Sequence, residues 1–284
     1  MTRPAWMLLG RRLMPAATVG SLWGPWALYR GDGLFETVGG EDGTLFLWEE
    51  HRERLRRSAM ELYGLDPALP GARAIARLLE AENRGMGPVA LRLFFLPGDR
   101  HGASFAWVER ARIPKRERRE GVELEPFVLP ATALSHHKLA SYGQAMAAWR
   151  WAKRQGAHGV LLVDPGGFIR ETATANVFVV FADRVVTPPA PGRALPGVIR
   201  AYCMSKLRQS GVHVSERDVT LQELALASGV FLTSSVAGLV PVRRVGPLAF
   251  PTRPWVLDRL LEDGFPAPGY RRRKSRTRST PRKS

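Results

Sequence analysis

Hydrophobic positions in the first half of the chain repeat every second residue in some stretches and every three to four residues in others. Between residues 49 and 63, Leu55, Ala59, Leu62 and Tyr63 fall on one face of a helix, with Arg and Glu side chains on the opposite face. Short apolar runs bounded by Gly and Pro are typical of strands. The pattern predicts strands over residues 22–29, 34–38, 89–95 and 105–108, and helices over residues 49–63 and 70–82.

The second half of the chain begins after a change in composition. Residues 111–120 read ARIPKRERRE, a charged stretch with a proline that is typical of a linker. Beyond it, DPGG at residues 164–167 predicts a tight turn, and Pro196 suits the first turn of a helix. We expect strands over residues 122–128, 160–163, 176–181, 212–215 and 230–233, and helices over residues 142–154, from about residue 196, and over residues 221–227.

These elements predict two domains of mixed α and β structure. The 284 residues are enough for two modest domains, and the 45% of hydrophobic residues can form a core. The sequence contains no internal repeat of solenoid length. We place an N-terminal α+β domain at residues 1–113, a linker at residues 114–120, a larger C-terminal α/β domain at residues 121–268, and a basic, disordered tail at residues 269–284.

The net charge of +16 is concentrated at one end of the chain. From residue 270 onward there are eight Lys and Arg residues and no acidic residue, which leaves +8 on the rest of the chain. A basic arm of this kind can bind nucleic-acid phosphates without sequence preference, but a solvated, disordered tail is the interpretation we favour. We therefore expect no nucleic-acid partner except through this tail.

Cysteine content and hydropathy bear on the cellular compartment of the protein and on whether it binds a metal. Cys203 is the only cysteine, so the chain can form neither an internal disulfide nor a Cys-based metal site, and we expect no metal. The apolar stretch within residues 1–12 is too short for a signal peptide, and no apolar stretch approaches the length of a membrane span. We expect a cytoplasmic protein with no membrane partner.

One lysine stands apart from the other five. Lys138 lies between a predicted strand and a predicted helix, in the stretch LSHHKLASY of residues 134–142, among apolar and small residues. Partial desolvation would lower the pKa of its amine and favour the neutral nucleophile that forms a Schiff base. From spacing alone, an ordinary loop lysine remains the stronger interpretation. The other lysines lie in charged or polar segments: Lys115, Lys153, Lys206, Lys274 and Lys283.

Six motifs, taken in order, resemble one enzyme family. They are GDGLFET at residues 31–37, HRERLRRSA at 51–59, the stretch around Lys138, GVLLVDPGGFIRETATANVF at 159–178, LPGVIR at 195–200 and FLTSSVAGLVP at 231–241. Each motif is weak alone, but together they resemble the class IV aminotransferases from Trp6 to about Val245. These are fold type IV pyridoxal-phosphate enzymes, which include branched-chain aminotransferase, D-amino acid aminotransferase and 4-amino-4-deoxychorismate lyase.

The resemblance implies a D-amino acid aminotransferase-like fold, with a small N-terminal α+β domain and a larger C-terminal α/β pseudo-barrel. It also implies pyridoxal 5'-phosphate as the cofactor. Lys138 would be the catalytic residue, which binds the cofactor covalently and moves a proton at the substrate's Cα. Glu171 would keep the pyridine nitrogen protonated, and Arg54 would bind the phosphate through its forked guanidinium. From the residues alone, Arg54 could be one solvated arginine and Glu171 the end of a hairpin.

Further cofactor contacts are implied for backbone amides and hydroxyl groups. The amides of Val198 and Ile199 would face the phosphate at the start of a helix, where free N–H groups suit an anion. Ser234 and Ser235 would add hydroxyl donors, and Tyr142 would hydrogen-bond the cofactor's phenolic oxygen. From the residues alone, the two serines could be plain strand ends, and Tyr142 is evenly balanced between cofactor contact and core packing.

Several positions depart from the family pattern. Ile199 stands where the family usually has Thr, so a hydroxyl to the phosphate is lost while the backbone amide remains. Gly238 and Val240 stand where branched-chain enzymes tend to carry Glu and Thr. Phe35 lacks the hydroxyl of the Tyr found in D-amino acid aminotransferases, and the run after Glu36 lacks the arginine that branched-chain enzymes usually carry.

The run Phe35-Glu36-Thr37 is most similar to the lyases, so Phe35 and Thr37 are candidates for substrate contact. Arg100 and His101 lie where the family places a substrate-facing loop, donated by the other subunit of a homodimer. The resemblance thus implies a 4-amino-4-deoxychorismate lyase, which acts on a small amino substrate and releases pyruvate and 4-aminobenzoate, a folate precursor. The alternative is an aminotransferase for branched-chain or other amino acids with 2-oxoglutarate as acceptor. A basic binding protein without chemistry is a distant third.

Overall fold

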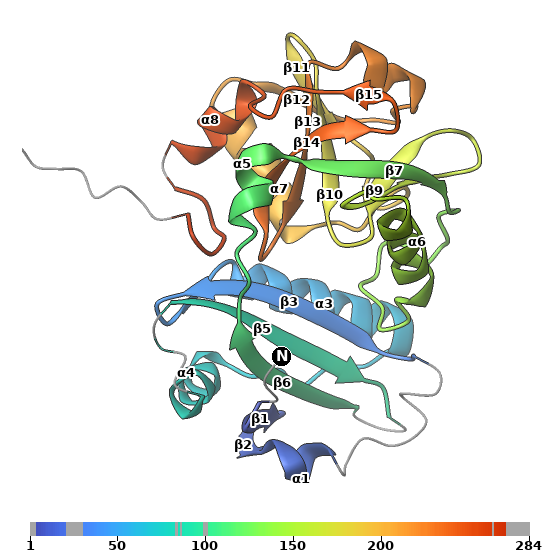
Figure 1. Cartoon of the computed structure of the whole chain (residues 1–284). Helices are drawn as coiled ribbons and strands as arrows, with labels where there is room; N and C mark the ends of the chain where they lie inside the picture. The colour runs from blue at the N-terminus through green and yellow to red at the C-terminus, as the bar shows by residue number, and fades with distance from the viewer. Residues whose placement is uncertain are drawn as a thin grey trace, which may run out of the picture.

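The computed structural model arranges the chain in two β-sheets, one above the other in Figure 1. It describes residues 4–20, 31–82, 85, 87–98, 102–262 and 264–270. One sheet uses strands up to Arg110 and the other starts at Val122, so the change of sheet falls inside the segment that we expected to be a linker. The strand expected over residues 22–29 lies outside the described residues.

The N-terminal sheet has six antiparallel strands in the order β2-β1-β6-β5-β3-β4. On β3, Leu34, Glu36 and Val38 are buried, and Phe35 and Thr37 between them are half-buried. This follows from the strand backbone, which points successive side chains to opposite faces. The strands are β1 (Trp6–Leu9), β2 (Arg12–Pro15), β3 (Leu34–Glu41), β4 (Thr44–Leu45), β5 (Pro88–Leu96) and β6 (Ala103–Arg110).

Helix α3 (Trp48–Tyr63) packs against β3 and shares its core. Leu55 and Ala59 are buried, as the apolar stripe of the sequence predicted. The helix ends at Gly64, whose φ of 64° suits the left-handed residue that commonly closes a last turn. The other helices of this half are α1 (Ala16–Gly20) and α4 (Ala72–Ala81).

The C-terminal sheet closes on itself. Its order is β12-β11-β10-β13-β14-β7-β8-β9, and β9 pairs again with β10, while β15 pairs with β14. The closed ring from β10 to β9 has an apolar core, which agrees with the expected pseudo-barrel. The strands are β7 (Val122–Val128), β8 (Gly159–Val163), β9 (Ile169–Thr172), β10 (Asn176–Val180), β11 (Arg184–Thr187), β12 (His213–Glu216), β13 (Gly229–Ser234), β14 (Gly238–Val245) and β15 (Leu248–Ala249).

Helix α5 (Lys115–Glu120) occupies most of the expected linker and packs against β14. Arg118 donates hydrogen bonds to the carbonyl oxygens of Ala237 and Pro268 at 2.8 and 2.9 Å, and these bonds fix the segment to the C-terminal sheet. The remaining helices are α6 (Gly143–Arg154), α7 (Val198–Gln209), the 3-10 helix η1 (Gln222–Leu226) and α8 (Val256–Leu261).

The expected tail begins with two described residues, Gly269 and Tyr270. Tyr270 is packed against the sheet, because its hydroxyl donates to the carbonyl oxygen of Leu239 at 2.8 Å and its ring lies 4.0 Å from the Arg118 guanidinium. Residues 271–284 lie outside the described part. Within the described part, no helix is both long and apolar enough to span a membrane.

Candidate active site

A cavity of about 920 Å³ is lined by both halves of the molecule. The N-terminal sheet contributes β3 and β5, and the C-terminal half contributes β9, the start of α7 and the turn after β13. Arg100 and His101 lie outside the described residues. The other predicted site residues all line the cavity: Phe35, Thr37, Arg54, Lys138, Tyr142, Glu171, Val198, Ile199, Ser234 and Ser235.

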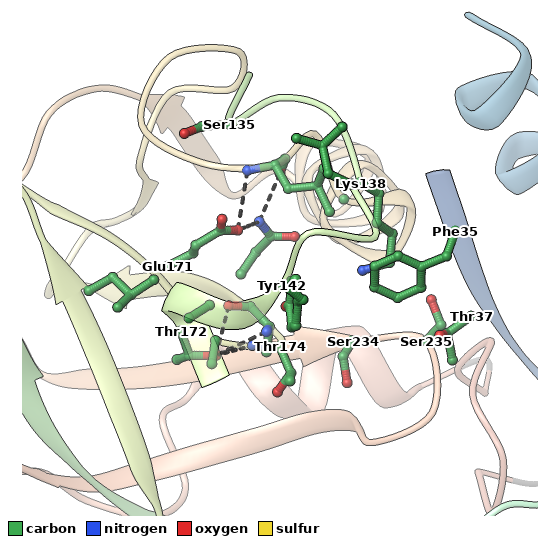
Figure 2. A pocket seen from close by; sticks show the side chains of 18 of the residues that line it. Phe35, Thr37, Ser135, Lys138, Tyr142, Glu171, Thr172, Thr174, Ser234 and Ser235 are labelled. Carbon is green, nitrogen blue, oxygen red and sulfur yellow. Dashed lines mark hydrogen bonds between the residues drawn. The ribbon is translucent and has the colours of Figure 1, made fainter. Parts of the chain in front are cut away.

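Lys138 is held at the edge of β3. Its carbonyl oxygen accepts a hydrogen bond from the backbone N–H of Phe35 at 2.9 Å. Its Nζ lies 4.4 Å from the centre of the Phe35 ring and 5.8 Å from that of Tyr142 (Figure 2). Burial, with the nearby charge of Arg54, lowers the pKa of the Lys138 amine to about 8. The amine is therefore closer to its neutral, nucleophilic form than an exposed lysine is.

Glu171 lies on β9 where this strand meets β10. Its Oε2 accepts hydrogen bonds from the side-chain amide of Asn176 and the backbone N–H of Leu195, both at 3.2 Å (Figure 2). Burial raises the pKa of Glu171 to about 7, although the hydrogen bond from Leu195 and the charges of Arg170, Lys138 and Arg54 oppose the shift. A protonated nitrogen placed beside Glu171 would favour the charged form of the carboxylate.

Glu36, His51 and Arg54 form a buried cluster next to the cavity. Arg54 Nε and Nη2 donate to the two carboxylate oxygens of Glu36 at 2.7 and 2.6 Å, and Nη1 donates to the carbonyl oxygen of Pro196 at 3.0 Å. His51 Nδ1 lies 2.7 Å from Glu36 Oε2, and its Nε2 lies 3.1 Å from Ser235 Oγ. Burial opposes ionisation of Glu36, but Arg54 and His51 outweigh it and lower the pKa of Glu36 to about 2.

These bonds change the expected role of Arg54. We expected its guanidinium fork to bind a phosphate, and in the structure the fork binds Glu36. Among the described residues, three of its five N–H groups are bonded, which leaves two to face an anion. Glu36 and His51 were not assigned a role from the sequence. The sequence does carry a signal for His51: it lies three residues before Arg54, so the two side chains share one face of α3.

The start of α7 offers a place for an anion. The N–H groups of its first turn, which begins at Val198 and Ile199, have no acceptor within the helix. A Cβ on the preceding Gly197 would collide with Oδ1 of Asn176, so only glycine lets the backbone come this close. The Ile199 side chain is buried in the core behind the helix, which leaves its backbone amide for the cavity.

Three hydroxyl groups gather at the end of β13. Ser234 and Ser235 were predicted, and Ser234 Oγ accepts a hydrogen bond from the Ala237 amide at 3.3 Å. Thr233 was not predicted. Its Oγ1 is buried and has no hydrogen-bond partner among the described residues, although Thr233 lines the cavity. A buried hydroxyl without a partner is costly, so an oxygen-rich ligand at this point would satisfy it.

Aromatic rings form one wall of the cavity. Phe35 stacks on Phe94 with ring centres 5.5 Å apart and meets the Tyr142 ring edge-on at 5.6 Å. Burial, with the negative charge of Glu171, raises the pKa of Tyr142 above its ordinary value, so its hydroxyl stays protonated and can donate. The wall therefore combines flat apolar surface with one hydrogen-bond donor.

Arg92 adds a positive charge to the same side of the cavity. It lies opposite Thr37 in the pairing of β5 with β3 and donates to Thr37 Oγ1 at 2.8 Å. It also donates to Glu109 Oε1 at 2.9 and 2.7 Å. Arg92 was missed from the sequence, where the signal is an arginine within the apolar strand ALRLFF.

The donor set fits pyridoxal 5'-phosphate. The Lys138 amine suits its aldehyde, and the Glu171 carboxylate suits its ring nitrogen. The first turn of α7, the free N–H groups of Arg54 and the hydroxyls of residues 233–235 suit a phosphate dianion.

Comparison with known proteins agrees with this geometry. A family model described as amino-transferase class IV matches residues 33–245. A bifunctional aminodeoxychorismate lyase / D-amino acid transaminase from Mycobacterium tuberculosis is 29% identical over 252 residues, which cover 80% of this chain and 86% of that protein.

Solved structures share the fold. The branched-chain amino acid aminotransferase of Escherichia coli superposes with a TM-score of 0.80 at 19% identity, over 92% of this chain and 93% of that one. A hypothetical aminotransferase from Mycobacterium tuberculosis, in a form with α-ketoglutarate and PMP bound, has a TM-score of 0.75 at 25% identity, over 90% and 96% of the two chains. This likeness confirms the predicted two-domain fold class.

Proposed function

Because the chain belongs to the class IV aminotransferase family and is an enzyme of it, we propose that it is a pyridoxal-phosphate-dependent 4-amino-4-deoxychorismate lyase. The reaction would split this substrate into pyruvate and 4-aminobenzoate. The Mycobacterium tuberculosis relative that matches 80% of this chain carries a lyase activity of this kind in its name.

The observation that carries the choice of substrate is the position of Arg92 beside the aromatic wall. Arg92 is held by Thr37 and Glu109 and lines the cavity on the same side as Phe35. Aminodeoxychorismate is a cyclohexadiene ring that bears two carboxylate groups, one on the ring and one on the enolpyruvyl side chain. Arg92 suits one of these carboxylates and the aromatic wall suits the ring, whereas an aliphatic amino acid has no ring for the wall to cover.

In the reaction, Lys138 is the group that moves protons. Bound pyridoxal phosphate supplies an electron-accepting ring that stabilises the charge left when the substrate's Cα loses its proton. Lys138 Nζ would take that proton and return it to the enolpyruvate group as the C–O bond to the neighbouring carbon breaks, which gives pyruvate. Glu171 would hold the proton of the ring nitrogen, and the Tyr142 hydroxyl would donate to the phenolic oxygen. The phosphate would be bound by Arg54, the first turn of α7, Ser234 and Ser235.

An aminotransferase with 2-oxoglutarate as acceptor is the second candidate, acting on branched-chain or other amino acids. The observation that favours it is again Arg92, because an arginine also suits the second carboxylate of 2-oxoglutarate. A structural neighbour at 25% identity has been solved with α-ketoglutarate and PMP bound. This reaction would use the same Lys138 and Glu171 but would end in hydrolysis rather than elimination.

We also propose that the enzyme acts in the cytoplasm as a homodimer, in which Arg100 and His101 of one subunit face the substrate of the other. We keep the proposed division into domains at residues 1–113 and 121–268. Sedimentation or light scattering of the holoenzyme checks the dimer, and a mass of 31.5 kDa, that of one chain, would contradict it.

One assay separates the two activities. The holoenzyme is incubated with aminodeoxychorismate, and in parallel with a panel of L- and D-amino acids and 2-oxoglutarate. The lyase proposal expects pyruvate and 4-aminobenzoate in equal amounts. Rapid formation of glutamate from 2-oxoglutarate, with no 4-aminobenzoate, would overturn it. A visible absorption band that borohydride bleaches checks the cofactor independently of the substrate.

A further inference from the structure

Three side chains with metal-binding atoms lie close together beside the loop that leads to Lys138. Glu61 stands on the last turn of α3, and His136 and His137 stand in the loop that leads to Lys138. The ligand atoms of these three side chains all lie within 4.8 Å of one another. Glu61 Oε2 is 3.9 Å from His136 Nε2 and 3.8 Å from His137 Nε2. The Nε2 atom of each imidazole ring therefore faces the same carboxylate oxygen of Glu61.

The two rings are placed as ligands rather than as hydrogen-bond partners of Glu61. Both separations exceed the reach of a hydrogen bond. His137 Nδ1 lies 3.0 Å from the Oγ of Ser58, a buried residue one turn before Glu61 on α3. Such a bond to the other ring nitrogen fixes the ring of a metal ligand and leaves Nε2 free to coordinate.

One cationic side chain lies near the buried ring of His137. Arg57 is the neighbouring charge that opposes a cation here, and it is exposed to solvent, which weakens its effect.

We propose that Glu61, His136 and His137 bind a Zn²⁺ ion. Two imidazole nitrogens and one carboxylate oxygen are donors that zinc prefers, with a fourth position left for water. Ligand atoms bound tetrahedrally at about 2.0 to 2.1 Å lie roughly 3.4 Å apart. The separations from Glu61, 3.8 and 3.9 Å, exceed this by about 0.5 Å, and the two imidazole nitrogens lie within 4.8 Å of each other. The half-exposed Glu61 and His136 side chains can move to close these distances.

The sequence analysis predicted no metal, and this proposal departs from it. Only cysteine ligands were considered there, and the sequence does not show that α3 brings Glu61 to a histidine pair 75 residues later. The ion would join the end of α3 to the loop that carries Lys138. Because it binds the folded chain only, it would stabilise the fold in proportion to its concentration. It takes no part in the proposed reaction, so the two proposals can fail separately.

Zinc titration of the tag-free holoenzyme tests the site. The protein is stripped with a chelator, dialysed without free cofactor, and titrated with zinc chloride in a calorimeter. We expect one saturable Zn²⁺ per chain and a rise in the thermal unfolding midpoint. X-ray absorption at the zinc edge should show two imidazole nitrogens and one carboxylate oxygen.

Matched variants locate the ion. Glu61→Gln and His136→Ala should each weaken zinc binding at least tenfold, while His213→Ala, an exposed histidine on β12, should leave it unchanged. Arg57→Gln should strengthen binding several-fold, because it removes a like charge. The visible band of the cofactor shows that each variant is folded. No saturable binding in the native protein, or unchanged affinity in both Glu61→Gln and His136→Ala, would overturn the proposal.

Discussion

Burial shifts the pKa values of Lys138 and Glu171 in opposite directions, and each shift favours the neutral form of its group. The pKa of Lys138 falls to about 8 and that of Glu171 rises to about 7. A protonated pyridine nitrogen beside Glu171 would favour the charged form of this carboxylate and so oppose the upward shift of its pKa. The individual side chains are therefore arranged for a ligand of defined charge pattern.

Lys138→Ala tests the proton transfer. The variant should lose about a thousandfold or more of kcat, the range of a positioned general base, and should also lose the visible band of covalently bound cofactor. Lys153→Ala is the matched control, because Lys153 is exposed on α6. Steady-state kinetics and an absorption spectrum measure both. Near-native turnover in Lys138→Ala would contradict its role.

Glu171→Gln tests the raised pKa through stability. In the cofactor-free protein, the ionised carboxylate is disfavoured by burial, so folding holds a proton that the unfolded chain releases above its pKa of 4.5. Wild-type stability should therefore fall relative to Glu171→Gln as the pH rises from about 4.5 to about 7, by on the order of 3 kcal/mol. Urea unfolding at pH 5 and pH 8 measures the difference, and parallel changes in both proteins would exclude the shift.

Glu36→Gln tests the buried cluster. Removing one partner of a buried ion pair leaves the Arg54 charge uncompensated and should cost about 3 to 5 kcal/mol. Glu49→Gln is the control, because Glu49 pairs with Arg52 at the surface and should change stability by less than about 0.5 kcal/mol. The Glu36 contribution is present above pH 4.5 and should be lost as the pH falls toward 2. Unfolding curves at pH 3 and pH 7 check both statements.

At the scale of elements, segments with strong hydrophobic periodicity could be predicted from the sequence, whereas some short strands could not. The helix expected over residues 49–63 is α3, and the strand expected over residues 122–128 is β7 without a change of bounds. Strand β9 was missed because its four residues include Arg170 and Glu171, which hide the apolar pattern. The expected linker contains α5, because Arg118 finds carbonyl partners that are distant in the sequence. Such long-range contacts are invisible to local patterns.

The same limit applies to the candidate site. The positions of Lys138, Glu171 and the start of α7 at one cavity could be predicted, because the motifs around them resemble a known family. Thr233 and Arg92 could not, since their importance depends on which face of a strand lines the cavity. The hydrogen bonds between Arg54 and Glu36 could not be predicted from the sequence either, because the two side chains meet only when α3 packs on β3.

Gly197→Ala tests the entry to α7. The added Cβ would collide with Oδ1 of Asn176, whose amide also bonds Glu171, so both the helix start and the carboxylate must shift. Cofactor affinity should fall at least about tenfold, in the range seen when supporting contacts are lost. Gly71→Ala is the matched control, because Gly71 precedes α4 and a Cβ there meets no neighbour. Fluorescence titration with pyridoxal phosphate measures both, and equal affinities would contradict the tight fit.

At the scale of the molecule, the cavity depends on the two sheets being held together. Gly39 of β3 lies so close to the turn after β13 that a Cβ would collide with the carbonyl oxygen of Ser235. His51 of α3 also contacts the Ser235 hydroxyl. The side of the cavity near Ser235 therefore depends on close contacts between the two halves of the chain.

The C-terminal end divides into a packed part and a charged part, and two truncations separate them. Deleting residues 271–284 removes eight positive charges and should weaken retention on DNA or heparin at low salt while kcat stays unchanged. Deleting residues 270–284 also removes Tyr270, with its bond to Leu239 and its stacking on Arg118, and should cost a further 1 to 2 kcal/mol, roughly, in the free energy of unfolding. Thermal unfolding and salt-gradient elution of the two proteins measure these effects. Retention that survives both deletions would show that the body of the protein, which still carries a net charge of +8, binds the polyanion instead.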